Sequence, residues 1–356
     1  MSSMMSMVGC ITSGDASSPK NAQTCLLLKI LPLIRCAVKQ QAPLYDCSLF
    51  CVARDFSLLL QTALECWGGA MSYAHISVDN QIGPVGAVVS GVDLSRPLAG
   101  EVIQEIHSAW LQHHVLFFRD QDLSATAQAR FASYFGELDQ YPFMQPVDES
   151  AFVIPIIKEA DATMNFGGDW HTDTSYTAYP PKATLLYAVE VPEEGGDTLF
   201  ADATAAYAAL SPAMRAALES WQGIYSPKLV HGQSGDYKSV AAKQNLGDAY
   251  GGNAEFAESE VEHPLIRTHE ETGNKSIYCS KPHTVNIKGW TRDESLAIFR
   301  FLTKHLTKDE FVTRFKWQPG SLAMWDNRCM FHNALNDYQG HRRHMHRVIV
   351  KGDRPQ

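Results

Sequence analysis

The chain has 356 residues, of which 45% are hydrophobic and 19% are charged, and this composition is typical of a globular protein rather than a disordered or fibrous one. Its formal net charge of -9 argues against nucleic acid as a partner, because phosphates call for a basic surface. No apolar run approaches the roughly 18 to 20 residues that span a bilayer, so we expect no membrane partner either.

The first 70 residues differ in character from the rest. Six of the eight cysteines lie within residues 1–66, where apolar, Ser-rich and Cys-rich stretches alternate without a sustained period. We expect residues 1–70 to be an N-terminal extension and residues 71–356 to be the folded domain. Three interpretations of the extension stay open: a targeting peptide, an accessory segment, or upstream sequence translated from an early start codon. Because there is no CxxC pair and no credible export signal, we expect a reducing, cytoplasmic location.

Regular patterns begin after Met71. A glycine-punctuated strand region is predicted at 83–92, a helix at 101–113 and a buried strand at 114–118. Ser124 is a suitable N-cap for a helix that ends near residue 135. Ser211 followed by Pro212 predicts a helix that runs to about residue 221.

The second half of the domain alternates short strands with helices. Thr291 with Glu294, and Thr307 with Glu310, have the spacing of capping boxes. Strand-like runs occupy residues 183–191, 276–279, 321–325 and 345–350. Short strands with a few outer helices favour an α+β chain built around a β-sandwich or jelly roll. The polar segment 226–262 is long for a loop, and we interpret it as a lid.

One candidate metal motif is formed by His171 and Asp173, two positions apart. If this segment is a strand, both side chains face one side, roughly 6.6 Å apart along the backbone, and can converge on one ion. The motif alone is weak, because about one His-x-Asp is expected by chance in such a chain. For the motif in isolation, a surface histidine beside an aspartate is the favoured interpretation.

The C-terminal block 325–350 strengthens the interpretation. His332 completes a set of two histidines and one carboxylate, which leaves positions open on an octahedral iron for a chelating keto acid and O2. Arg343 follows eleven residues later. On a strand, Arg343, Met345 and Arg347 share one face, while His344 and His346 point the other way. An arginine suits the far carboxylate of a dicarboxylic acid, although a solvated basic patch is the alternative for this pair.

Four separated blocks agree in order and spacing with one known family. They are residues 115–121 with Phe-Gly-Glu-Leu at 135–138, the His-x-Asp block at 170–173, Gly-Gly-Asp-Thr-Leu at 195–199, and residues 325–347. Together these blocks resemble the taurine and 2,4-dichlorophenoxyacetate dioxygenases, a family of non-haem iron enzymes. The resemblance covers residues 71–356 and none of residues 1–70.

The resemblance implies a double-stranded β-helix, or jelly roll, with helices packed outside. It implies that His171, Asp173 and His332 hold Fe(II) and form the catalytic centre. The cosubstrate 2-oxoglutarate would chelate the iron, and its distal carboxylate would pair with Arg343 and Thr198. With O2, the reaction would yield succinate and CO2 and hydroxylate a C–H bond of the substrate.

The family comparison also bears on the substrate. Taurine-specific members have a His and a Tyr after the Phe-Gly-Glu-Leu block and an Asn four residues before the ligand histidine. This chain has Tyr141, Met144 and Gly167 at those places, which argues against taurine. Arg347 aligns with an arginine that contacts anionic head groups, so we expect a small anionic substrate: a sulfonate, sulfate ester, aryloxy acid or phosphonate. Together with Met144 and Gly167, Tyr141 and Tyr176 are the candidate substrate-binding residues beside Arg347.

Two other classes of protein share parts of this pattern. A non-catalytic metal-binding β-barrel sensor would keep the histidines and the aspartate but would need no arginine for a keto acid. A zinc hydrolase would use the same three ligands without 2-oxoglutarate. Arg343 and Thr198 favour the oxygenase over both, and the sequence leaves open whether the protein forms a homo-oligomer.

Overall fold

The computed structural model describes residues 73–232, 235 and 253–356. The predicted extension, residues 1–70, lies outside the described residues, as does most of the predicted lid, at 233–234 and 236–252. Within the described part, no helix has the length and apolar character that would let it cross a membrane.

The largest sheet has eight strands in the order β1-β2-β3-β14-β6-β16-β4, with β5 also paired to β16. All its pairs are antiparallel except β2 with β3. Its strands are β1 (Ser77–Asp79), β2 (Ala87–Ser90), β3 (Val115–Phe118), β4 (Leu138–Asp139), β5 (Ile154–Lys158), β6 (Ala183–Glu190), β14 (Leu322–Asp326) and β16 (Arg343–Val350).

Three smaller sheets complete the β structure. The sheet β13-β7-β15 is formed by β13 (Val312–Phe315), β7 (Thr198–Asp202) and β15 (Met330–Ala334). The sheet β12-β8-β9 is formed by β12 (Thr284–Ile287), β8 (Gln222–Tyr225) and β9 (Val261–Pro264). The third is the hairpin of β10 (Ile266–Thr268) and β11 (Lys275–Ile277).

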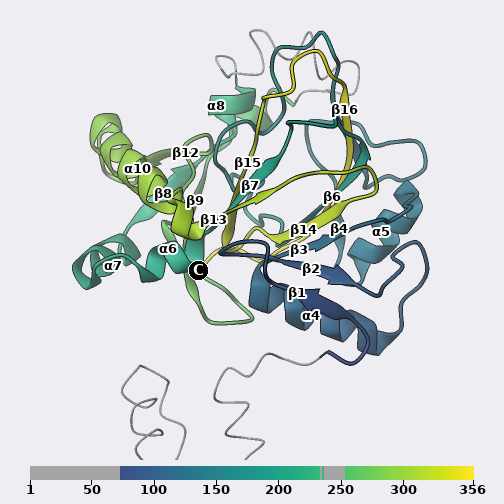
Figure 1. The fold of residues 1–356 in the computed structure, drawn as a ribbon. Coiled ribbons are helices and arrows are strands. Elements are labelled where there is room, and N and C mark those ends of the chain that lie inside the picture. Colours follow the sequence, from purple (N-terminus) through teal and green to yellow (C-terminus); the bar gives the residue numbers. More distant parts are fainter. Residues whose placement is uncertain (1–72, 233–234, 236–252) are drawn as a thin grey trace, which may run out of the picture. The chain divides into compact units, whose positions relative to one another are not determined.

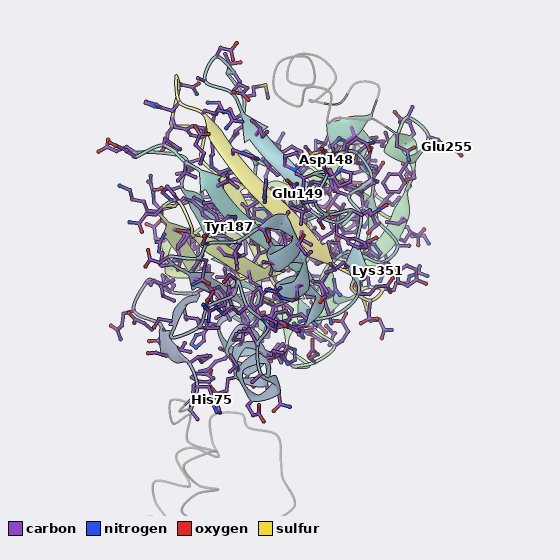
Figure 2. All side chains as sticks on the ribbon, turned by 90° about the vertical axis from the view of Figure 1, so that its right-hand side faces the viewer. His75, Asp148, Glu149, Tyr187, Glu255 and Lys351 are labelled. Atoms are coloured by element: carbon purple, nitrogen blue, oxygen red, sulfur yellow. The ribbon has the colours of Figure 1, made fainter. Side chains whose placement is uncertain are left out.

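Helices lie at two places around these sheets (Figure 1). The helices α4 (Gly100–His113) and α5 (Ala125–Ser133) pack on the large sheet, and Figure 2 shows α5 lying across it, with Tyr187 of β6 labelled beside it. The other helices gather near the β12-β8-β9 sheet (Figure 1). They are α6 (Ala203–Ala208), α7 (Pro212–Glu219), α8 (Lys228–His231), α10 (Arg292–Leu306) and the 3-10 turns η4 (Phe256–Glu258) and η5 (Asp309–Phe311).

The strand β3 shows why its sequence is apolar at every position. Leu116 and Phe118 belong to the core between the large sheet and the helices α4 and α5. Val115 and Phe117 belong to a second core, which also contains Phe200 of β7. Because successive side chains of a strand point to opposite faces, a strand buried on both faces is apolar throughout. The predicted buried strand is confirmed. One of its neighbours in the large sheet is β14.

Most predicted helix starts are confirmed. The hydroxyl of Ser124 accepts a hydrogen bond from the Ala127 N–H, that of Ser211 caps α7, and Thr291 with Glu294 forms a capping box. The second predicted capping box is wrong. Thr307 ends α10, and its hydroxyl donates to the Thr303 carbonyl, because the buried face of the helix continues to Leu306.

Candidate metal centre and active site

Two histidines from distant parts of the sequence are fixed face to face by the backbone. His171 and His332 form an isolated antiparallel bridge, in which the His171 N–H donates to the His332 carbonyl at 3.1 Å and the His332 N–H donates back at 2.8 Å. His332 lies on β15. Their ring centroids are 4.2 Å apart, so the bridge alone brings both imidazoles to one place.

Asp173 reaches the same place from a turn. His171 and Asp173 do not share a strand, since only His171 makes a bridge and the chain turns from Asp173 onward. Thr174 has a positive φ of 46°, a left-handed conformation that is uncommon outside glycine. The turn, rather than the period of a strand, places the carboxylate beside the imidazoles.

The three side chains converge. Oδ1 of Asp173 lies 3.8 Å from Nε2 of His171 and 3.9 Å from Nε2 of His332. One ligand atom from each residue lies within 4.8 Å of the others, and all three residues are buried. A single ion about 2.1 Å from each ligand atom can hold atoms up to about 4.2 Å apart, so a small inward movement completes such a site.

Burial and the groups around these side chains set the tautomer of His171 and the protonation states of Asp173 and His332. Nδ1 of His171 lies 2.6 Å from the Asp169 carbonyl, which makes Nδ1 the donor and leaves the Nε2 lone pair facing the cluster. Burial alone would raise the pKa of Asp173, but Arg347, His332, His171 and a hydrogen bond from Thr184 together hold it well below its ordinary value. Burial and the neighbouring His171 lower the pKa of His332 to about 3. Neutral imidazoles and an ionised carboxylate are the forms that bind a divalent metal.

A small cavity of about 40 Å³ joins this cluster to Arg343 and Thr198, since all five residues line it. The Nε and Nη2 atoms of Arg343 are buried without a hydrogen-bond partner among the described residues. The indole N–H of Trp317 donates to the Thr198 hydroxyl oxygen at 2.9 Å. A hydroxyl has one hydrogen, so Thr198 keeps it for another acceptor. The cavity thus holds donors that suit a carboxylate.

The predicted alternation along β16 is confirmed. Arg343, Met345 and Arg347 are buried, whereas His344 and His346 are only partly buried. Both arginines line the small cavity. Nη2 of Arg347 lies 2.9 Å from Oδ1 of Asp173, and its guanidinium lies 5.0 Å from the ring centroid of Tyr141.

A larger cavity of about 1090 Å³ also borders the cluster. His171, Asp173 and Arg347 line it, together with the predicted substrate residues Tyr141, Gly167 and Tyr176. Met144 is not among the lining residues and instead packs in the apolar core, so the structure does not bring it to the site. Gly167 has φ of 78°, and a Cβ there would lie 3.3 Å from the His171 ring. Only glycine therefore fits beside His171 without strain.

Two further histidines line the larger cavity and were not predicted from the sequence. His283 places Nδ1 3.0 Å from the Ser175 hydroxyl, and its ring lies 5.7 Å from that of His171. His231 places Nε2 3.2 Å from the Tyr141 hydroxyl, and burial lowers its pKa to about 3. Neither lies in a motif, since each is brought to the site by a contact between distant segments.

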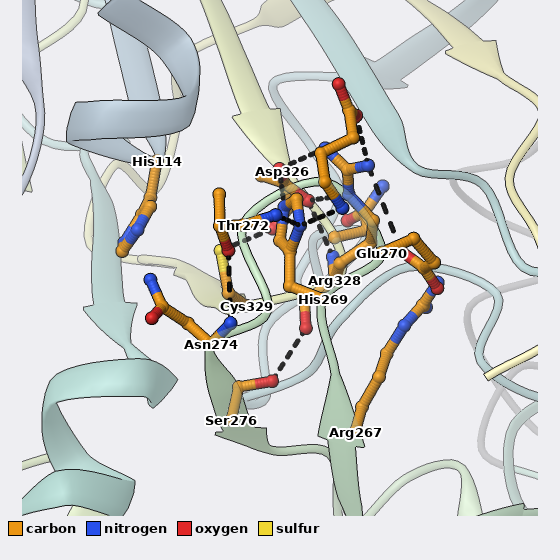
Figure 3. A network of polar contacts seen from close by, with 12 residues as sticks. His114, Arg267, His269, Glu270, Thr272, Asn274, Ser276, Asp326, Arg328 and Cys329 are labelled. Carbon is orange, nitrogen blue, oxygen red and sulfur yellow. Dashed lines mark hydrogen bonds and ion pairs between the residues drawn. The ribbon is translucent and has the colours of Figure 1, made fainter. Parts of the chain in front are cut away.

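A second buried cluster contains His269, Asp326 and Cys329 (Figure 3). Arg328 binds both oxygens of Asp326, through Nε at 2.8 Å and Nη2 at 2.6 Å. Nε2 of His269 adds a contact at 3.0 Å, and burial raises the pKa of the Cys329 thiol well above its ordinary value. A carboxylate held by such a fork has little capacity left for a metal.

The chain is similar to known proteins over most of its described length. Residues 78–349 match the family model described as taurine catabolism dioxygenase TauD, TfdA family. The chain is 32% identical over 274 residues to an alkylsulfatase of Acinetobacter baylyi, covering 76% of this chain and 83% of that protein. It is 32% identical over 285 residues to an alpha-ketoglutarate-dependent sulfate ester dioxygenase of Pseudomonas putida, covering 79% and 91%.

A solved structure is similar as well. The crystal structure of a taurine dioxygenase from Burkholderia xenovorans superposes with a TM-score of 0.65 at 32% identity, covering 79% of this chain and 91% of that chain. The chain therefore belongs to the TauD, TfdA family. The predicted enzyme class, an oxidoreductase that depends on Fe(II), 2-oxoglutarate and O2, is confirmed, and the sensor and hydrolase interpretations find no support.

Proposed function

We propose that His171, Asp173 and His332 hold the Fe(II), and that Arg343 and Thr198 bind the distal carboxylate of 2-oxoglutarate. The observation that carries this assignment is the small cavity, which is lined both by the histidine and aspartate cluster and by Arg343, whose Nε and Nη2 have no hydrogen-bond partner among the described residues. A buried cation with free donors costs free energy unless an anion pairs with it. A dicarboxylate that reaches from the metal to Arg343 would supply an anionic partner to each of them.

When bound, the iron and keto acid supply the oxidation of a C–H bond. The residues of the chain do the rest. The two imidazoles and the carboxylate would hold the ion and would leave coordination positions open for the keto acid and O2. Arg343 and Thr198 fix the length and direction of the keto acid. Apolar neighbours line the small cavity, among them Trp325, whose ring centroid lies 4.7 Å from that of His332.

We further propose that the substrate is an anion, with a sulfate ester as the first candidate. Arg347 is buried, lines the larger cavity and leaves its Nε without a hydrogen-bond partner among the described residues. Once Asp173 is a metal ligand, its charge is shared with the ion, and Arg347 can pair with an anionic head group. Tyr141, Gly167 and Tyr176 form the adjoining wall. Two of the similar proteins carry names that refer to alkyl sulfates or sulfate esters.

We also propose how the sheets combine and which residues form the catalytic domain. We infer that the large sheet and the β13-β7-β15 sheet together make the predicted double-stranded β-helix, since each contributes ligands or arginines to one cavity. We also propose that residues 71–356 are the catalytic domain, because the family match lies within them. Expressing Met71–Gln356 beside the full chain tests this boundary by comparing their activity and thermal unfolding.

A screen for substrate-dependent succinate release tests the function. The full-length protein is supplied with Fe(II), 2-oxoglutarate and O2 and challenged with alkyl sulfates, sulfonates, aryloxy acids and phosphonates. We expect succinate release that needs both iron and an anionic substrate, strongest with an alkyl sulfate, and none in Asp173→Ala. Release that is equally fast with uncharged analogues of the same length would contradict the role of Arg347.

A further inference from the structure

Asn327 lies directly behind the metal cluster, one residue after the end of β14, and is buried. Its side chain makes contacts in two directions. Oδ1 accepts from the Trp325 indole N–H at 2.9 Å and from the Asp173 N–H at 3.3 Å. Nδ2 lies 2.8 Å from the hydroxyl oxygen of Thr184. Thr184 lies on β6 and its hydroxyl lies 2.6 Å from Oδ2 of Asp173.

The direction of every hydrogen bond in this chain of contacts is determined. An indole N–H can only donate, so the amide oxygen of Asn327 must face Trp325 and the amide nitrogen must face Thr184. The Thr184 oxygen therefore accepts from Asn327. Its single hydrogen is left for Asp173, whose ionised carboxylate can only accept.

We propose that Asn327 and Thr184 are positioning residues that decide which oxygen of Asp173 faces the metal. The bond from Thr184 holds Oδ2 away from the cluster, so that Oδ1 alone faces Nε2 of His171 and of His332. One-point ligation by Asp173 leaves more of the ion open to the keto acid and O2 than a two-point carboxylate does. This inference rests on the proposed assignment of Asp173 as a metal ligand.

The turn that carries Asn327 is held from its other side. Asp326 and Arg328, its two neighbours, pair with each other and with His269 and Glu271 in the second cluster (Figure 3). The hydroxyl of Thr172 donates to the Asn327 carbonyl at 2.7 Å. The second cluster thereby anchors the turn that carries Asn327, the residue proposed to position Asp173 in the first cluster.

The experiment compares metal binding in variants of the full chain. Mn(II), which does not react with O2 here, is titrated into the protein by calorimetry, and the metal-free proteins are compared by thermal unfolding. Thr184→Val keeps the shape and removes the hydroxyl, Thr184→Ser restores the hydroxyl, and Asn327→Asp replaces the N–H donor that faces Thr184 with an acceptor. Thr313→Val is the matched control, because Thr313 is equally buried and its hydroxyl donates to the Val85 backbone carbonyl at 2.7 Å.

We expect Thr184→Val and Asn327→Asp to bind Mn(II) about 10-fold to 100-fold more weakly, as removal of partners behind metal ligands commonly does. Thr184→Ser and Thr313→Val should bind Mn(II) within about twofold of the wild type. A merely structural loss in Thr184→Val would not explain this difference between Thr184→Val and its matched control. If Thr184→Val and Asn327→Asp both keep wild-type affinity while Asp173→Ala loses binding, the positioning role alone is overturned. Wild-type affinity in Asp173→Ala instead overturns the ligand assignment itself.

Discussion

His171, Asp173 and His332 form one buried cluster of histidine and carboxylate, and His269, Asp326 and Cys329 form another. The two differ in how the carboxylate is paired. Asp326 is held at both oxygens by one guanidinium, whereas Asp173 meets one nitrogen of Arg347 and two imidazoles. The first cluster also borders two cavities.

The comparison teaches that burial and residue type do not by themselves mark a metal centre. Both clusters contain a histidine and an aspartate of low pKa in a buried setting. What separates them is the bonding capacity that remains around each cluster: Arg343, which lines a cavity with the first cluster, has donors without a hydrogen-bond partner among the described residues. The second cluster stabilises the fold, and the first is open to ligands.

The largest expected effect separates the two clusters by stability. Asp326→Asn removes the charge that pairs with buried Arg328, and breaking a buried pair costs about 3–5 kcal/mol. Urea unfolding of the metal-free protein measures the free energy of unfolding. Asp173→Asn is the control and should cost clearly less, because Arg347 borders a large cavity. Equal decreases in the free energy of unfolding of Asp326→Asn and Asp173→Asn would contradict the distinction between the two clusters.

The next effect concerns the keto acid. Arg343→Gln removes a buried charged donor, and hydrogen bonds to charged groups contribute about 1.5–3 kcal/mol, so the KM for 2-oxoglutarate should rise roughly 10-fold to 100-fold. Steady-state succinate release measures KM. Arg342→Gln is the matched control, since Arg342 pairs with Glu159 and Glu190 outside the cavity and should leave KM unchanged. A normal KM in Arg343→Gln would show that the keto acid binds elsewhere.

A third prediction concerns how the free energy of unfolding depends on pH through His263, which belongs to neither cluster. Burial lowers the pKa of His263 to about 4, while an unfolded chain has about 6.5. Between these values the unfolded protein binds the extra proton, so the free energy of unfolding decreases as the pH falls, by about 1.4 kcal/mol per pH unit for this group. His263→Gln, followed by urea unfolding from pH 7 to pH 5, should show a shallower dependence. An unchanged slope would contradict this.

The smallest effect is expected at Thr198. Thr198→Val removes one donor to the keto acid while Arg343 remains, so the KM for 2-oxoglutarate should rise about threefold to tenfold, the range of a single hydrogen bond. The same succinate assay measures it. Thr198→Ser should restore the wild-type KM because it keeps the hydroxyl. Failure of that rescue would point to packing against Trp317 as the cause.

Local patterns predicted much of this arrangement. Helix caps at Ser124, Ser211 and Thr291 and the alternation of β16 depend on neighbours in sequence, so the sequence was sufficient for them. The candidate ligands were predicted as a set because their spacing matched a known family. The structure then brought His171, Asp173 and His332 together.

Contacts between distant segments could not be predicted in this way. His269 meets Asp326 across 57 residues, and Asn327 meets Thr184 across 143, and no local pattern marks either pair. The strand considered for His171 and Asp173 does not form, because a bridge to His332 and a turn take its place. Met144 turned into the core, since an apolar side chain gains more from packing than from lining a polar cavity.

Titration of Mn(II) into the wild type and single-residue variants tests the central claim most directly. We predict one equivalent in the wild type, no measurable binding in His171→Ala, Asp173→Ala or His332→Ala, and wild-type binding in any His269→Ala protein that remains folded. Loss of binding in folded His269→Ala, with binding retained in the other three, would contradict the account.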